Sequence, residues 1–248
     1  MRRAIAAGLF TALLITWAMV SPASSFAATE KSTAVIKVEH VGGFVGPNFK
    51  SARLPDVVLY SDGRILTPRN LSDSVRQMFQ GSVSKIILQS EITAFIKAMK
   101  TPIGGWGLPG VADVPSTRVS LMQNGKERIV EVYALGFALN SSLKDASAAR
   151  KKLSLAIEHL IALGGKKTIY SPTKYEVWPQ GNISNGTATG ILWPNDIAPP
   201  TTNCVGVTAQ PFQALLRNAG SKPWLLPNGD IINLTWRPVL PGEIACKR

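Results

Sequence analysis

Residues 53–68 read RLPDVVLYSDGRILTP, and this stretch decides the fold. An apolar run, Val57–Tyr60, reaches the dipeptide Asp62-Gly63, and a second short apolar run follows. An Asp-Gly dipeptide between apolar runs is typical of a β-hairpin, because a tight two-residue turn needs positive φ. The stretch therefore predicts a central strand of a sheet and the hairpin that leaves it.

Two more hairpins are expected around the Asn-Gly dipeptides at 124–125 and 228–229. A two-residue turn at the first places Val119 opposite Val130 on an inward face. It also places Arg118 opposite Glu131 on a face that is wet or only partly covered. Pro227 removes a backbone donor beside the second turn, so that loop is expected to be longer than two residues.

Apolar periodicity predicts the helices. The longest is expected over 143–163, where an apolar stripe recurs at helical spacing until two glycines end it. A second is expected over 90–100, with Ser90 as its N-cap. Residues 83–88 are expected to form a strand, and residues 69–80 a short helix or an irregular segment. Many hairpins and few crossover helices favour an α+β fold, with mainly antiparallel sheet and two or three packed helices.

Residues 1–27 have the basic start, apolar core and small-residue site of a secretory signal peptide. Cleavage is expected after Ala27, with Ala23 as the second choice; the alternative is an uncleaved anchor, although the core is short for a membrane span. Removal leaves 221 of 248 residues and lowers the net charge from +12 to +10, because two arginines leave. The remainder divides into an α+β part, 28–140, and a helix with a C-terminal hairpin, 141–248, or forms one continuous domain.

The chain has two cysteines, Cys204 and Cys246, both after the signal. In an exported chain an isolated pair is most simply one disulfide. Closing this loop would stabilise the fold by about 3–4 kcal/mol in the loop-entropy model. The alternative is a reactive thiol, which no nearby histidine supports.

Four segments of the mature chain resemble those of a family of exported actinobacterial proteins of unknown function. They are 42–44 with 54–55 and 59–64, then 111–117, then 132–136, and 237–243 with Cys246. The resemblance implies a secreted or cell-envelope location. It implies no catalytic residue.

Few residues have the spacing of known catalytic or metal sites. HExxH, CxxC and clustered histidines are absent, so we expect no metal site, no cofactor and no assigned catalytic residue. His40 with Asp56 or Asp62 is the one arrangement that suits a hydrolase. His159 is interpreted as a partly buried structural histidine.

Paired carboxylates offer a second route to hydrolysis, on wall polysaccharide. The candidates are Asp56, Asp62 and Asp113. Asp62 is better explained by its turn, and Asp113 by a loop or a strand edge.

The positive charge suggests a binding surface. The candidate contact residues are an aromatic residue on a glycine-rich loop and the cations in and after the longest predicted helix: Trp106, Arg150, Lys151, Lys152, Lys166 and Lys167. The alternatives are a solvated helix face and, for Trp106, packing onto the core. The net charge favours an anionic envelope polymer, lipid head groups or an envelope protein as partner, and export disfavours nucleic acid.

The sequence thus favours an exported, non-enzymatic binding or interaction protein with a basic surface and no transmembrane span after cleavage. One alternative is a secreted hydrolase acting on wall glycans or esters. Another is a small-ligand carrier or inhibitor module that uses the sheet face.

Overall fold

A computed structural model describes most of the chain after the predicted signal. The described residues are 32–43, 53–72, 75–100, 106–140, 142–163, 167–185, 190–200, 203–210, 212–213, 216 and 222–247. The signal peptide predicted over 1–27 lies outside them. Neither helix in this part of the chain has the length and apolar composition that a membrane span requires.

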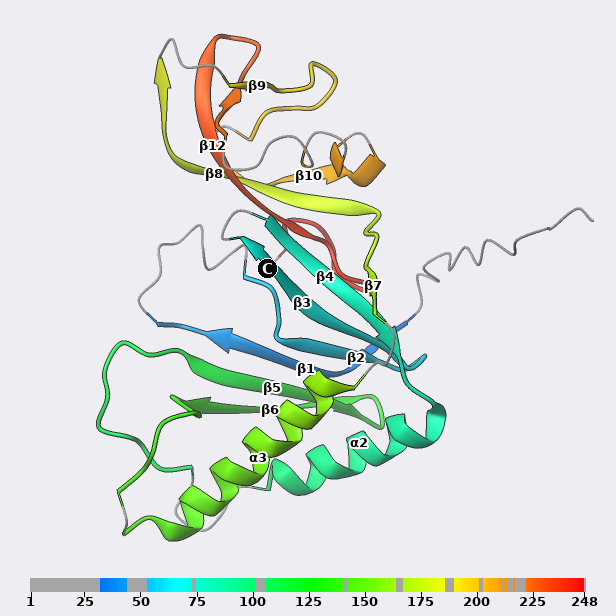
Figure 1. Cartoon of the computed structure of the whole chain (residues 1–248), viewed down its shortest axis with the longest axis vertical. Helices are drawn as coiled ribbons and strands as arrows, with labels where there is room; N and C mark the ends of the chain where they lie inside the picture. The colour runs from blue at the N-terminus through cyan, green and yellow to red at the C-terminus, as the bar shows by residue number, and fades with distance from the viewer. Residues whose placement is uncertain are drawn as a thin grey trace, which may run out of the picture.

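The strands form two sheets, one above the other in Figure 1. The larger has the order β6-β5-β1-β2-β3-β4-β7 and the smaller the order β10-β8-β12-β11-β9. Their bounds are β1 Ala34–Val41, β2 Val57–Tyr60, β3 Arg64–Ser72, β4 Val75–Ser82, β5 Ser116–Gln123, β6 Lys126–Tyr133, β7 Thr168–Ile169, β8 Lys174–Asn185, β9 Ile191–Leu192, β10 Val205–Thr208, β11 Trp224–Leu225 and β12 Asp230–Pro238. All recorded pairs are antiparallel except β11 with β9, which confirms the predicted α+β fold with mainly antiparallel sheet.

The quoted stretch forms the middle of the larger sheet. All four residues of β2 are buried, as expected of a central strand covered on both faces. Three residues, 61–63, separate β2 from β3, one more than predicted. Gly63 has φ +84°, and a Cβ there would lie 2.5 Å from the carbonyl oxygen of Val83, so only glycine fits this turn.

The hairpin of β5 and β6 has the predicted register. Val119 pairs with Val130, and Arg118 pairs with Glu131. Asn124 and Gly125 both have positive φ, as a two-residue turn requires. The predicted length of the β11–β12 loop is also confirmed, because three residues, 227–229, separate Leu226 from Asp230, whose backbones are hydrogen-bonded.

Two helices, α2 (Lys85–Ala98) and α3 (Lys144–Ala162), lie on one face of the larger sheet (Figure 1). α3 matches its prediction. α2 begins earlier than predicted, because Ser84 rather than Ser90 caps it: the Ser84 hydroxyl accepts a hydrogen bond from the Ile87 backbone N–H. The strand predicted over 83–88 is therefore wrong. Residues 69–72 and 75–80 belong to the paired strands β3 and β4, not to a helix or an irregular segment.

The change from one sheet to the other falls between β7 and β8. This is later than the division at 140/141 suggested by the sequence. α3 packs in the same apolar cluster as α2, and β7 pairs with β4, so α3 and β7 belong with the larger sheet.

The other face of the larger sheet is covered only in part. Over β2, β3 and β4 it packs against Tyr170 and Leu240. The Tyr170 hydroxyl donates to the carbonyl oxygen of Val239 at 3.1 Å, which holds the segment after β12 against this sheet. Over β1, β5 and β6 the same face carries charged side chains.

A buried ion cluster lies where the two sheets meet. Arg237 of β12 and Glu176 of β8 are opposite each other in the ladder and fully buried, with Nε and Oε2 2.6 Å apart. A second guanidinium nitrogen of Arg237 binds Glu243. The other oxygen of Glu176 accepts from the backbone N–H of Cys246 at 2.8 Å. Cys246 is bonded to Cys204, which confirms the predicted disulfide.

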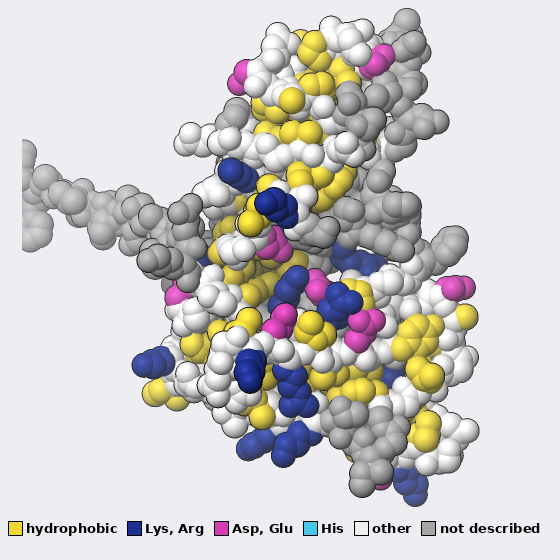
Figure 2. Space-filling view, turned by 180° about the vertical axis from the view of Figure 1, so that it is seen from behind, with side chains coloured by type: hydrophobic (Ala, Val, Ile, Leu, Met, Phe, Trp, Pro, Cys, Tyr) yellow, Lys and Arg dark blue, Asp and Glu magenta, His cyan; other side chains and the backbone are white. Residues whose placement is uncertain are grey.

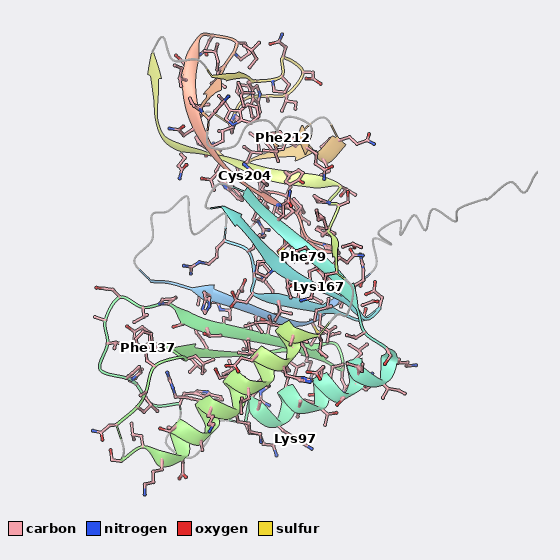
Figure 3. The ribbon with its side chains drawn as sticks, viewed as in Figure 1. Phe79, Lys97, Phe137, Lys167, Cys204 and Phe212 are labelled. Carbon is pink, nitrogen blue, oxygen red and sulfur yellow. A yellow bond between two sulfur atoms is a disulfide. The ribbon has the colours of Figure 1, made fainter. Side chains whose placement is uncertain are left out.

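The smaller sheet has an aromatic core of its own. Rings from β8, β11 and β12 pack with two from the connecting segments: Tyr175, Trp193, Phe212, Trp224 and Trp236. Figure 3 shows Phe212 beside β10.

Candidate functional site

The end of β1 brings ionisable side chains to both faces of the larger sheet. Side chains alternate along a strand, so Ile36 and Val38 face the helices and join their core. His40 continues that row, whereas Lys37 and Glu39 face the opposite side. The chain therefore presents a histidine on one face and an ion pair, 2.7 Å from Nζ to Oε2, on the other.

His40 and Asp56, which sequence analysis named together, are in contact. His40 Nε2 lies 3.1 Å from Asp56 Oδ2, and the two side chains are 42% and 29% exposed. Burial raises the pKa of the Asp56 carboxyl, and Glu39 adds to this, while His40 and Arg53 oppose it. If His40 is neutral and donates from Nε2, its Nδ1 is free to accept a proton.

Arg53 connects this pair to a groove on the face away from the helices. Its Nη1 donates to the carbonyl oxygens of His40 and Gly42, at 3.2 and 3.5 Å. The groove has a volume of about 590 Å³. Its ionisable lining residues are Lys37, Glu39, His40, Arg53, Arg118, Glu243 and Lys247. We call it the basic groove.

The charge balance of the basic groove is positive. Four of its side chains are lysine or arginine and two are carboxylates. Glu243 is already bound by Arg237 from inside the fold. Figure 2 shows Lys, Arg and carboxylate side chains gathered on this face, around the junction of the sheets.

A second groove lies on the helix side of the same sheet, between α3 and the strands. It has a volume of about 570 Å³. Its apolar lining residues are Pro68, Phe79, Leu135, Ile157 and Ile161. Its polar ones are His40, Asp56, Thr67, Thr117, Ser154, Glu158 and Lys167. We call it the apolar trough. His40 lines both grooves.

A third groove, of about 630 Å³, runs between α2 and α3. Glu91 of α2 is buried there and lies 3.2 Å from Nδ1 of His159, whose side chain is 62% exposed. His159 was expected to be partly buried and structural. It is instead largely exposed, whereas the carboxylate of Glu91, its partner in the ion pair, is buried.

Arg150 is an interior residue. It is 3% exposed, and its guanidinium donates to the carbonyl oxygens of Trp106, Tyr133, Ala134 and Phe137. Because its guanidinium is buried, Arg150 cannot contribute to an exposed binding surface. Trp106 is half-buried and packs against the core under the helices, the alternative that sequence analysis left open.

The predicted lysines are separated. Lys151 and Lys152 are exposed on α3, and Lys152 lines the α2–α3 groove. Lys167 is exposed at the apolar trough, where its Nζ donates to the carbonyl oxygen of Ile161 at 3.3 Å. Lys166 lies outside the described residues.

The other acidic candidates lie outside these grooves. Asp62 accepts from the backbone N–H and Nε of Arg64 in the β2–β3 turn, at 3.0 and 2.7 Å. Asp113 has φ +57° in an exposed loop. Among the described residues, no group of three or more His, Cys, Asp or Glu is placed to hold a metal ion.

Comparisons were made with family models, curated proteins and solved structures. None of them matches this chain. The resemblance to an exported actinobacterial family therefore remains a proposal, and function rests on the geometry of the grooves.

Sequence analysis missed the basic groove as a site. Its cations come from β1, the segment before β2, β5 and the segment after β12, far apart in the chain. The alternation of Lys37 and Glu39 with apolar residues was the available signal, because it marks one face of a strand as polar.

Proposed function

We propose that this is an exported binding protein that holds an anionic polymer of the cell envelope in the basic groove. The observation that carries the proposal is the convergence of four cationic side chains on one concave surface. A polymer that repeats phosphate or carboxylate groups along its length would meet these cations in turn.

The available cations differ in their partners. Lys37 and Arg118 are held by Glu39 and Glu131. Arg53 binds two backbone carbonyls through one nitrogen, and Lys247 makes no ion pair with a described side chain. Arg53 and Lys247 would therefore make the first contacts with a polyanion, whose attraction salt screens over about 8 Å at physiological ionic strength.

The test is binding of two labelled polyanions, polyphosphate and polygalacturonate, at low and high salt, by fluorescence anisotropy. We expect binding that high salt weakens. The double variant Arg53→Gln, Lys247→Gln should lose most of it. The matched control Lys151→Gln, Lys152→Gln removes the same charge from α3 and should retain it.

An equal loss of binding in both variants would show that the polymer is attracted to the whole basic surface and is not held in the basic groove. Salt-resistant binding would exclude the electrostatic mechanism. Vesicles of phosphatidylglycerol form a third arm, and binding to vesicles without binding to either polymer would assign the groove to lipid head groups instead.

A hydrolase is the second candidate, and the contact between His40 and Asp56 favours it. Nδ1 of neutral His40 would take a proton from water as the water attacks an ester carbonyl, and would return it to the leaving alkoxide. No hydrogen bond joins His40 to a serine or threonine hydroxyl in the described part of the chain, so water is the expected nucleophile. Hydrolysis of p-nitrophenyl esters should then be lost in His40→Asn and kept in His159→Asn; equal rates in both would discard this candidate.

A further inference from the structure

The apolar trough lies over strands β5, β1, β3 and β4 of the larger sheet. His40 pairs with Thr117 across β1 and β5, and Thr67 pairs with Phe79 across β3 and β4. The next pair along, Phe79 with Ile169, reaches β7. The floor thus takes side chains from β5, β1, β3 and β4, and Lys167, just before β7, lines it as well.

One face of α3 forms the wall. Ser154, Ile157, Glu158 and Ile161 follow the i, i+3, i+4, i+7 spacing of one helix face, and all of them line the trough. Together with Pro68, Phe79 and Leu135, the two isoleucines give the trough an apolar lining.

The two ends of the trough differ in polarity. Leu135 and Gly136, which follow β6, lie at the β5 end. Lys167, which precedes β7, lies at the other, and Figure 3 shows it close to Phe79, above the carboxyl end of α3. Lys167 is exposed, so a charged group bound by it would keep its contact with water.

Two carboxylates also line the trough. Asp56 is in contact with His40, and Arg53 lies close enough to act on its charge. Glu158 stands on the exposed side of α3. They disfavour an anion beside them, so among the described lining residues Lys167 marks the favourable end for an acidic group.

We propose that the apolar trough binds a single-chain acidic amphiphile, with its hydrocarbon chain across the strands and its acidic head at Lys167. The volume of about 570 Å³ lies within the range of about 300–1,000 Å³ typical of small-ligand sites. This site lies on the opposite face of the sheet from the basic groove. The proposal for the trough therefore does not depend on the proposal that the basic groove binds a polyanion.

The probe for the test is dansylated undecanoic acid, whose fluorescence rises in an apolar site. Ser154→Phe fills the trough from the α3 wall and should weaken probe binding by at least about tenfold, the equivalent of about 1.4 kcal/mol. Ala148→Phe adds the same ring to an exposed position of α3 and should leave binding unchanged. Equal binding by the wild type and both variants, or no binding by the wild type, would overturn the proposal.

The head group is tested by competition with dodecanoate, dodecanol and dodecylamine, which share one chain length. Dodecanoate should compete best and dodecylamine worst. Lys167→Gln should weaken the binding of dodecanoate by about two- to fivefold, which is the scale of an exposed ion pair, and should leave the binding of dodecanol unchanged. Lys151→Gln is the control and should leave the binding of both unchanged. Because Lys167→Gln changes only a surface side chain, it keeps the test valid if Ser154→Phe fails to fold. Preferred binding of the amine would overturn the assignment of an acidic head.

Discussion

Two groups of charged residues meet at Glu243. At the junction of the sheets, Arg237 and Glu176 are fully buried and bind each other. On the wet face of the larger sheet, Arg118 and Glu131 form a pair whose side chains are 40% and 44% exposed. Glu243 binds Arg237 and also lines the basic groove. Net charge alone does not separate the groups; burial decides which charges hold the fold and which are open to a ligand.

The largest expected effect comes from breaking the buried group. Arg237→Leu leaves the carboxylates of Glu176 and Glu243 without their guanidinium, so we expect a loss of about 3–5 kcal/mol in the free energy of unfolding. Urea unfolding of the purified protein measures it. The matched variant on the wet face, Arg118→Leu, should lose no more than about 1 kcal/mol. Equal losses in the two variants would end the distinction between the groups.

The disulfide supports the same junction. Cys204 and Cys246 are 42 residues apart, and replacing both with serine should lower the free energy of unfolding by about 3–4 kcal/mol. Reductant should lower the unfolding midpoint of the wild type toward that of the double variant. The double variant serves as its own control, because reductant should not move its midpoint. A wild type that is indifferent to reductant would contradict the prediction.

Neighbouring residues on α3 give the sharpest form of the comparison. Arg150 is buried against four carbonyl oxygens, and Lys151 is exposed. Arg150→Met should cost about 2–3 kcal/mol, because it leaves buried carbonyls without a charged donor. Lys151→Met should stay within about 0.5 kcal/mol of the wild type. Thermal unfolding of both variants measures the difference, and an Arg150→Met variant as stable as Lys151→Met would move Arg150 to the surface group.

The smallest effect concerns Asp56, whose pKa is raised above its ordinary value of 3.8, chiefly by burial. The folded state therefore holds this proton to higher pH than the unfolded state. The contribution of protonated Asp56 to the stability of the folded state is therefore full below pH 3.8, and it is lost as pH rises through the raised pKa. Asn cannot titrate, so Asp56→Asn should gain in stability relative to the wild type as pH rises across that window.

Urea unfolding at several pH values would follow this difference. His40→Asn provides the complement, because His40 opposes the shift: without it, the pKa of Asp56 should rise further and the dependence should extend to higher pH. A pH-independent difference between Asp56→Asn and the wild type would show that Asp56 does not titrate abnormally.

The parts of the fold that could be predicted depend on local signals. Asn124-Gly125 specifies its hairpin because the backbone there has positive φ, and the apolar stripe of α3 repeats with the helix period. The disulfide could be predicted because the chain has two cysteines. His40 and Asp56 could be named together, although only the pairing of β1 with β2 brings them to 3.1 Å.

The parts that could not be predicted depend on tertiary contacts. Pro179 suggests a loop, yet it lies within β8, opposite Leu234 of β12 and beyond the last pair that β8 makes with β10. A proline is tolerated where a strand has become an edge. Likewise, nothing in the run Arg150-Lys151-Lys152 indicates that the first cation is interior, because its partners are carbonyl oxygens 13 to 44 residues earlier in the chain.

The bond between Cys204 and Cys246 also changes what a protease can do to this molecule. The covalent ring that it closes contains β10, β11 and β12. A single cut of the peptide chain inside this ring leaves both pieces attached, with β10 and β12 still on either side of β8. Such a nicked protein would migrate as one species in a gel without reductant and separate into two only after reduction.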